Sequence, residues 1–422
     1  MLLSIIIVNY NVKYFLEQCL CSLEKSVRTA GLSYGGGAEI FVVDNHSSDG
    51  SMEWLIPRFP SVQFMANPDN RGFARANNQA LEKASGKYVL FLNPDTILAE
   101  NSIATVLGFM EITPAAGAAG VRMIDGGGRF LKESRRGFPS PWVAFCKLTG
   151  LASLFPRSSF FAKYYLGHLP ASADHPAPVL SGAFMLVRRQ VLQATGGFDE
   201  RFFLYAEDID LSYRIEKAGY TNYYISGTTI LHFKGESTRK DARYIKLFYK
   251  AMSQFRRKHF RGGLPSAFNF LMEAAIWLRA GLSAFANFFR LKENADGAQD
   301  GSKRSDASGA TGSADIWAGS AWRGIPGSAP VDPVYIGGDP VNARLLRGLL
   351  AAEGWQVVPD PAGADERILC EGEGFSFSDI IEAIGNSRGE AIYMIHAAAS
   401  SSAVGSRSKD GRGETLFFPP KA

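Results

Sequence analysis

The chain has 422 residues, of which 46% are hydrophobic and 20% are charged, with a formal net charge of +4. This length exceeds one ordinary domain, so we expect two or three globular domains, and the small net charge argues against a nucleic-acid partner. The four cysteines lack the Cys-x-x-Cys spacing of a zinc site and the density of a disulfide-stapled fold, which favours a cytoplasmic protein. They are Cys19, Cys21, Cys146 and Cys370.

Short apolar runs at residues 3–8, 39–43, 62–65 and 88–92 predict buried strands, and several of the segments between them have helical spacing. The first run has no basic segment before it and no small-residue cleavage site after it, so we interpret it as a strand and not as a signal peptide. The alternation predicts an α/β fold with a Rossmann-like, mostly parallel sheet and helices on both faces.

Polar residues follow the first two predicted strands, as Asn9-Tyr10-Asn11 and as a segment that begins at Asp44. Each motif alone is typical of a turn, but open α/β sheets bind ligands at the carboxyl ends of their strands. An aspartate there can accept a hydrogen bond from a pyrimidine base, asparagines can bind ribose, and an arginine can neutralise diphosphate charge. The predicted donor-binding rim continues along 70–78, with Asn70, Gly72, Arg75 and Asn77.

The strand at 88–92 leads into Asn93-Pro94-Asp95. The tripeptide alone favours a rigid turn, but at a strand end Asp95 can hold a divalent ion against diphosphate oxygens. His232 ends a β-like run from Tyr223 and is the predicted second metal ligand. An imidazole ligand makes Mn²⁺ as suitable as Mg²⁺.

Glu207 and Asp208 begin a predicted helix that stops near Gly219. Acidic residues in a first turn also stabilise a helix through its dipole, which is the structural alternative. The functional interpretation is that Asp208 removes a proton from an acceptor hydroxyl. One base opposite a leaving group implies a single displacement with inversion at the anomeric carbon.

Residues 139–178 are rich in aromatic and basic side chains. Two interpretations stay open for this segment: a packed excursion without function, or a surface loop that receives a lipid-bearing acceptor. The segment from Lys234 to Arg261 contains ten Lys or Arg and only two acidic residues. This excess of positive charge favours binding to anionic phosphates or lipid headgroups, but it also suits the solvated face of a helix.

The remaining boundaries follow from composition. Residues 251–292 form a predicted basic and amphipathic membrane-associating segment, in which the apolar stretch 267–289 is interrupted by Glu273 and Arg279 and could instead pack on the protein. Residues 293–330 are predicted to be a flexible linker. Residues 331–422 are predicted to be a small Rossmann-like α/β domain, although Gly337-Gly338-Asp339 is not a full dinucleotide fingerprint.

These motifs, in this order, resemble the inverting nucleotide-sugar glycosyltransferases of family 2, which have the GT-A fold, and among them the rhamnosyltransferase-like branch. The resemblance covers residues 1–250, the predicted catalytic domain. It implies that Asn9, Asn11, Asp44 and the segment 70–78 hold the nucleotide. Asp95 matches the last aspartate of the metal-binding Asp-x-Asp motif, whose first position is Asn93 here.

The same resemblance implies that Asp208 is the catalytic base and His232 a later metal ligand, with Ser181, Gly182 and Glu207 on the acceptor side. It implies transfer of a sugar from dTDP-rhamnose or a UDP-sugar, with Mn²⁺ or Mg²⁺, to a lipid-linked or polysaccharide glycan of the cell envelope. The expected location is peripheral, on the cytoplasmic face of the inner membrane. The alternative is a non-catalytic scaffold of a glycan-assembly complex; a nucleotidyltransferase would need a glycine-rich basic loop after the first strand, where Asn9–Phe15 offers none.

Overall fold

The computed structural model describes residues 1–140, 142–143, 146, 150–233, 242–259, 321–322, 333–364, 366–387, 391–406 and 414–417. They belong to two compact units, one of residues 1–203, 207–237 and 319–422, and one of residues 204–206 and 238–318. The predicted membrane-associating stretch 267–289 and most of the predicted linker lie outside the described residues.

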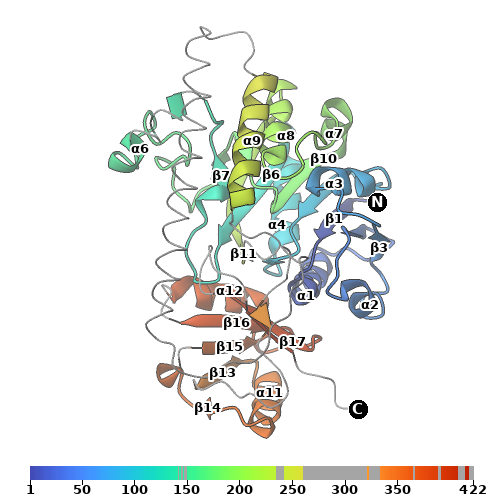
Figure 1. Ribbon diagram of the computed structural model, residues 1–422, viewed down its shortest axis with the longest axis vertical. Coiled ribbons are helices and arrows are strands. Elements are labelled where there is room, and N and C mark those ends of the chain that lie inside the picture. Colours follow the sequence, from blue (N-terminus) through green and yellow to red (C-terminus); the bar gives the residue numbers. More distant parts are fainter. Residues whose placement is uncertain are drawn as a thin grey trace, which may run out of the picture. The chain divides into compact units, whose positions relative to one another are not determined.

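A nine-stranded sheet forms the centre of the first unit (Figure 1). Its order is β3-β2-β1-β4-β10-β6-β11-β5, with β8 paired to β11. Strands β3, β2, β1 and β4 are parallel, β10 runs antiparallel between β4 and β6, and β11 is parallel to β6. The strands are β1 (Leu3–Asn9), β2 (Ala38–Asp44), β3 (Gln63–Ala66), β4 (Tyr88–Leu92), β5 (Thr96–Ile97), β6 (Ala116–Ile124), β8 (His175–Pro176), β10 (Phe184–Arg188) and β11 (Thr221–His232).

Helices cover both faces of this sheet, as predicted. Alternate side chains of β1 enter different cores, since strand side chains point to opposite faces in turn. Leu3, Ile5 and Ile7 pack with α1 (Lys13–Thr29) and α4 (Ser102–Ile112). Ile6 and Val8 share the opposite core with residues of α3 (Phe73–Leu81), α7 (Arg189–Thr195) and α8 (Glu207–Lys217). The α/β fold with a mostly parallel sheet is therefore confirmed.

The connections of the first sheet contain α2 (Ser51–Leu55), η1 (Lys132–Ser134) and α6 (Leu151–Leu154). Two short strands, β7 (Arg135–Arg136) and β9 (Val179–Leu180), form an antiparallel pair of their own. This pair joins the two ends of the aromatic segment 137–178, so the segment leaves and returns at one place.

A second sheet, of seven strands, follows in the same unit. Its order is β12-β18-β17-β16-β15-β13-β14, and β14, β13, β15 and β16 are parallel. The elements are β12 (Ala321–Trp322), β13 (Val334–Gly338), α11 (Pro340–Ala352), β14 (Val357–Val358), η2 (Pro361–Gly363), β15 (Glu366–Cys370), α12 (Phe377–Asn386), β16 (Ile392–His396), β17 (Ser402–Gly405) and β18 (Glu414–Phe417). Residues 321–322 lie within the predicted linker but form β12 here.

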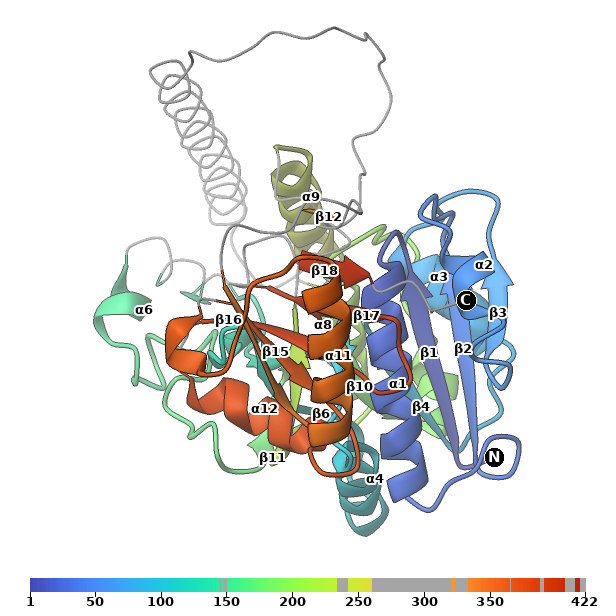
Figure 2. The same ribbon diagram turned by 90° about the horizontal axis from the view of Figure 1, so that it is seen from below.

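Helix α1 packs against both sheets (Figure 2). The fully buried Gln18 amide donates to the Ser402 carbonyl at 2.9 Å and to the Ser400 hydroxyl at 2.8 Å, and it accepts from the Ala397 amide at 2.9 Å. Two turns further along α1, Lys25 forms an ion pair with buried Glu371. Because these partners follow β15 and β16, α1 covers the carboxyl edge of the second sheet.

The second unit contains one described helix, α9 (Ala242–His259). Its last turn is basic, with Arg256, Arg257, Lys258 and His259. Within the described residues, no helix combines the length and the apolar character that a membrane crossing needs.

Candidate active site

The ends of β1 and β2 form a tight polar rim. The Asn9 amide donates to Asp44 Oδ1 at 2.8 Å and to the Ser47 hydroxyl at 3.1 Å, while the Ser47 amide donates to Asp44 Oδ2 at 3.0 Å. Asn11 has a left-handed φ of 54° and accepts from the Ser48 amide at 2.7 Å. A left-handed non-glycine residue costs energy and is typical of functional sites. Each Asp44 oxygen can accept a second hydrogen bond, so the rim is ordered but can still take a ligand donor.

Asn70 continues this rim through Asn45. The Asn45 amide donates to Asn70 Oδ1 at 2.8 Å, and Asn70 Oδ1 also accepts from the Gly72 amide at 3.0 Å. Gly72 has φ 83°, and a Cβ there would lie 2.8 Å from the Phe203 carbonyl oxygen. The position therefore requires glycine, both for its backbone angle and for the close approach of Phe203.

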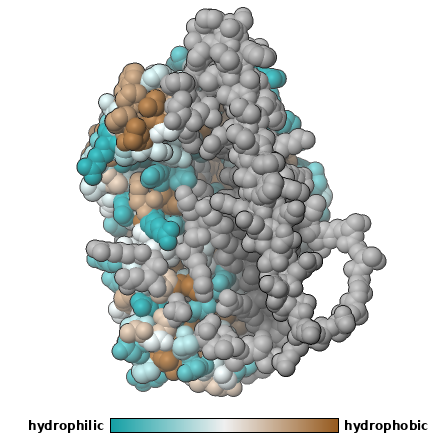
Figure 3. Space-filling model, turned by 60° about the vertical axis from the view of Figure 1, so that its left-hand side comes forward, coloured by the Kyte–Doolittle hydropathy of each residue, from teal (hydrophilic) through white to brown (hydrophobic). Residues whose placement is uncertain are grey.

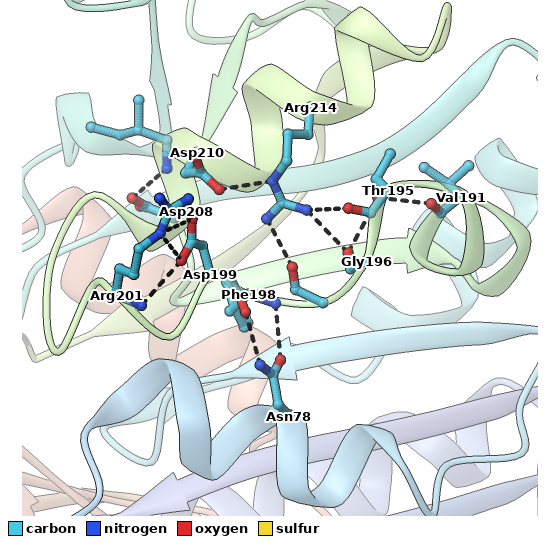
Figure 4. Close-up of polar contacts among 12 residues, drawn as sticks. Asn78, Val191, Thr195, Gly196, Phe198, Asp199, Arg201, Asp208, Asp210 and Arg214 are labelled. Atoms are coloured by element: carbon cyan, nitrogen blue, oxygen red, sulfur yellow. Dashed lines mark hydrogen bonds and ion pairs between the residues drawn. The ribbon is translucent and has the colours of Figure 1, made fainter. Parts of the chain in front are cut away.

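Arginine and asparagine side chains of α3 differ in their surroundings. Arg75 is 62% exposed, and its ion-pair partner within the described part of the chain is the Glu200 carboxylate at 3.9 Å, so the guanidinium can contact a phosphate. Asn77 is buried and donates to the Phe73 carbonyl in its own helix, so this side chain serves α3 and does not line the rim. Asn78 exchanges hydrogen bonds with the Phe198 backbone at 2.8 and 2.9 Å, which ties α3 to the loop before α8 (Figure 4).

Asp95 and His232 meet at the predicted metal position. His232 Nε2 lies 3.3 Å from Asp95 Oδ1 and 3.4 Å from the side-chain nitrogen Nδ2 of Asn93. The three residues meet because β11 pairs with β5 at Thr96. Asp95 Oδ1 is buried and has no hydrogen-bond partner among the described residues. A carboxylate oxygen and an imidazole nitrogen this close fit a divalent cation such as Mn²⁺.

These two side chains would leave most of a metal's coordination shell to other ligands. No group of three or more His, Cys, Asp or Glu side chains with metal-binding geometry occurs in the described parts of the chain. A cation at Asp95 and His232 would therefore take its remaining ligands from water and from a bound diphosphate.

Asp208, the predicted base, stands at the start of α8 with a fixed orientation. Arg136 Nη2 lies 2.5 Å from Asp208 Oδ2, the Gly182 amide donates to the same oxygen at 3.3 Å, and the Ile209 amide donates to Oδ1 at 2.8 Å. Although burial alone would lower it, the pKa of Arg136 lies above its usual value because of this ion pair. The cation at Arg136 is permanent, and it holds the carboxylate in place.

Glu207 lies beside this pair in a different environment. Its side chain is buried, and Oε2 has no hydrogen-bond partner in the described structure. Burial, and secondarily the charge of Asp208, raises the pKa of Glu207 above its ordinary value. The two adjacent acids therefore differ in their surroundings: Asp208 is ion-paired and Glu207 is not.

Arg214 anchors the helix that carries Asp208. Its guanidinium contacts Asp210 Oδ2 at 2.7 Å, the Thr195 carbonyl at 2.6 Å and the Gly197 carbonyl at 2.8 Å (Figure 4). Together with Asn78, which binds Phe198, it joins α3, the 195–198 loop and α8 into one frame. The donor-side helix and the base-side helix are thus held by the same loop.

Short contacts link Asp208 to the predicted metal ligands Asp95 and His232. The nearest atoms to a Cβ built on Gly182 are Asp208 Cβ at 3.5 Å and Phe73 Cε1 at 4.0 Å. The next residue, Ala183, accepts at 3.0 Å from the amide of Asn93, whose side chain reaches His232. Ser181 is also nearby, but its hydroxyl accepts from the Ala183 amide at 3.3 Å within the same turn.

Buried polar atoms without a partner gather at this site. Native proteins satisfy nearly all buried polar groups, so such atoms mark places where a ligand or water completes the bonding. Among the described residues they include Asn9 Oδ1, Asp95 Oδ1, Arg136 Nε and Glu207 Oε2.

Arg136 was missed by the sequence analysis. An Arg-Arg pair is usually a solvated surface feature, and nothing in its spacing relates it to Asp208, 72 positions later. Only the pairing of β7 with β9 brings Arg136 beside the turn at Gly182, and that pairing is not visible in a two-residue strand.

The sequence is similar to those of known glycosyltransferases. Residues 4–196 match the model of glycosyl transferase family 2. An N-acetylglucosaminyl-diphospho-decaprenol L-rhamnosyltransferase of Mycobacterium tuberculosis is 28% identical over 292 residues, which cover 66% of this chain and 92% of that protein. The rhamnosyltransferase WbbL of Escherichia coli K12 is 28% identical over 49% of this chain and 72% of its own length.

A solved structure of Staphylococcus aureus TarS 1-349 in complex with UDP-GlcNAc covers 69% of this chain and 76% of its own, at 20% identity and a TM-score of 0.44. A likeness of that extent adds nothing about the site. The family match and the two sequence relatives agree with the observed sheet. Residues 4–196 are therefore a glycosyl transferase family 2 domain, and the chain is a glycosyltransferase that is similar in sequence to rhamnosyltransferases.

Proposed function

We propose that the protein moves one sugar from a pyrimidine nucleoside diphosphate, dTDP-rhamnose or a UDP-sugar, to a hydroxyl of a lipid-linked or polysaccharide glycan of the cell envelope. The names of the relatives support the sugar and the acceptor class, since one of them is named for a diphospho-decaprenol acceptor. The observation that carries the proposal is the placement of the Asp208 carboxylate beside Gly182, one residue from the backbone contact to Asn93.

In the proposed reaction Asp208 accepts the proton of the acceptor hydroxyl. The hydroxyl oxygen forms a bond to the anomeric carbon while the bond from that carbon to the diphosphate oxygen breaks, and the diphosphate leaves with the electron pair. The acceptor attacks opposite the leaving group, so the configuration inverts. Arg136 and the Gly182 amide orient the carboxylate for this proton transfer.

The donor occupies the rim in this proposal. Asn9, Asn11 and Asp44 hold the nucleotide, and Asn70 and Gly72 form the edge of the nucleotide site. The exposed Arg75 neutralises charge on the diphosphate. Asp95 and His232 would hold Mn²⁺ or Mg²⁺, which would neutralise charge on the departing diphosphate. Ser181, Gly182 and Glu207 face the acceptor side.

We also propose that the enzyme works at the cytoplasmic face of the membrane as a peripheral protein. All four cysteines are unpaired and buried, as suits a reducing compartment. A lipid-linked acceptor, as in the name of the mycobacterial relative, would require the site to reach a membrane surface.

Calorimetric binding of UDP, dTDP and GDP to the full chain, first with Mn²⁺ and then with a chelator, tests the donor site. We expect one pyrimidine diphosphate to bind best and to bind more weakly after chelation. Equal affinity with and without chelator would remove the metal from the proposal, and no binding of any nucleotide would favour a scaffold role.

Asp208→Asn tests the base. We expect transfer to fall by about 10²–10⁴-fold, the usual contribution of general base catalysis, while nucleotide affinity stays unchanged. Glu216→Gln, in the last turns of the same helix, is the matched control and should keep full activity. If Asp208→Asn transferred sugar at the normal rate, the base would have to be another group.

A further inference from the structure

Residues 137–178 carry a dense group of exposed hydrophobic side chains. Ten large hydrophobic residues are exposed in the described parts of the chain, and four of them fall between residues 142 and 160. They are Trp142 (37% exposed), Leu154 (70%), Phe155 (46%) and Phe160 (59%). Figure 3, which turns this side forward, shows hydrophobic side chains gathered on the described surface.

The aromatic side chains in this group form one connected cluster, and Leu154 directly precedes one of them, Phe155, in the chain. The Trp142 ring lies 4.7 Å from Phe160, and Phe161 lies 5.2 Å from both Phe155 and Phe160. We call Trp142, Leu154, Phe155, Phe160 and Phe161 the aromatic patch. Monomeric soluble proteins rarely expose contiguous apolar groups of this kind unless the groups meet a partner or a membrane.

The charged residues around the aromatic patch indicate which kind of partner it meets. Between Ser134 and Ala173 the sequence has no Asp or Glu, and of its Lys and Arg residues Arg135 and Arg136 are held by contacts inside the protein. Two of the other cations, Arg157 and Lys163, are exposed among the patch residues. Aromatic side chains bordered by cations are typical of surfaces that insert into the headgroup region of anionic bilayers.

The patch is joined to the active site at both ends of its segment. Arg136, which contacts Asp208, directly precedes the segment, and β9 leads from its end into Gly182, whose amide contacts the same carboxylate. Near its base the segment is fixed by the Gly137 amide, which donates to the Tyr164 carbonyl at 2.7 Å, and by Phe138 against Tyr213 of α8. Both ends of the segment that carries the patch are therefore tied to residues that contact the Asp208 carboxylate.

We propose that the aromatic patch is a membrane-docking surface that inserts into an anionic phospholipid bilayer and presents the lipid-linked acceptor to Asp208. The inference rests on the proposed function, since it assumes that the acceptor is held in a membrane. It chooses between the two interpretations of residues 139–178 that the sequence left open, because a packed excursion would bury the side chains that are exposed here.

A local probe tests the docking directly, whatever other segment also binds lipid. The four native cysteines are buried, so a nitroxide can be attached selectively at Ser159→Cys, an exposed position inside the patch, and at Ala115→Cys, an exposed control position after α4. With vesicles of phosphatidylcholine and phosphatidylglycerol, we expect the label at 159 to become protected from a water-soluble relaxation agent and the label at 115 to stay accessible. Protein that bound the vesicles while position 159 stayed accessible would overturn the proposal.

A variant series separates docking from donor binding. Leu154→Ser, Phe155→Ser and Phe160→Ser combined should lower partition into anionic vesicles by ~tenfold or more and lower transfer to a vesicle-embedded acceptor accordingly, with unchanged nucleotide affinity. Ile112→Ser, at the 81% exposed last residue of α4 and outside the patch, is the control and should change neither. Unchanged vesicle binding of the triple variant would contradict the docking surface. If the wild-type protein bound no nucleotide, that result would instead contradict the proposed function itself.

Discussion

At the scale of single residues, the orientation of the proposed base depends on a largely buried ion pair. Arg136 and Asp208 are each exposed by less than 15% of their side chains, so their interaction is weakly screened by water. The other bonds to the Asp208 carboxylate come from the neutral backbone amides of Gly182 and Ile209. The Arg136 guanidinium thus acts as a positioning group for the base.

Arg136→Gln should lower kcat at least tenfold while the nucleotide affinity stays within about twofold, because the partner that orients the base is lost but the rim is intact. Arg136→Lys should restore part of kcat, since it keeps the charge without the planar fork. Steady-state kinetics with calorimetric nucleotide binding checks both. Full turnover in Arg136→Gln would show that the Gly182 amide is a sufficient anchor.

The burial of Glu207 leads us to expect that the stability of the folded protein depends on pH. Burial and then Asp208 raise its pKa in the folded protein, so the folded chain keeps a proton that the unfolded chain releases above the ordinary value near 4.5. The corresponding stability is complete below that value and is lost as the pH rises toward the folded-state pKa. Glu207→Gln, which cannot ionise, should therefore have a higher urea midpoint than the wild type at pH 8.

At pH 5 the two midpoints should converge. Glu53→Gln, at an exposed glutamate of α2, supplies the baseline for loss of a surface charge. A difference between Glu207→Gln and wild type that did not depend on pH would mean that packing and not ionisation governs this position.

At the scale of elements, the strand pattern was well predicted from sequence and the loop geometry was not. The predicted strands at 3–8, 39–43, 62–65 and 88–92 differ from β1 to β4 by one residue or less at each end, because short branched runs bounded by polar residues have few other stable arrangements. The helix predicted after Glu207 and the strand that ends at His232 are also present.

Side-chain assignments within those elements depended on contacts that the sequence does not display. Asn77 belongs to a motif with Asn70 and Arg75, yet it is buried in α3, because helical periodicity turns it inward. Asn78 and Arg214 look like ordinary polar residues but bind the 195–198 loop. Long-range pairing decided these roles.

Gly72 gives an element-scale prediction. Gly72→Ala should weaken nucleotide binding at least tenfold, because a Cβ would strike the Phe203 backbone and push the start of α3 away from Asn70. Gly31→Ala is the matched control, with a similar positive φ of 71° and open space around the Cβ. Equal effects of the two substitutions on affinity would show that backbone strain alone matters.

At the scale of the whole first unit, the two sheets share α1 as a common buried layer. Gln18→Leu removes four hydrogen bonds to residues 397–402 and leaves buried groups unpaired, so we expect a loss of roughly 2–4 kcal/mol in the free energy of unfolding. Gln79→Leu in α3, whose Oε1 has no partner among the described residues, is a matched control and should cost far less. Urea unfolding followed by fluorescence and circular dichroism gives both values.

The wild type should unfold in one transition with both probes, since the shared layer couples the sheets. Two separate transitions in the wild type would show that the sheets are independent and that Gln18 contributes only locally.

The position of α1 has a consequence for ligand binding by the second sheet. Parallel sheets of this kind ordinarily offer the carboxyl ends of their strands to a small molecule. Here that edge receives Gln18 and Lys25 of the same chain, so a metabolite arriving there would compete with the enzyme's own helix. The edge of the second sheet at which a small molecule would ordinarily bind is thus occupied by side chains of the catalytic half.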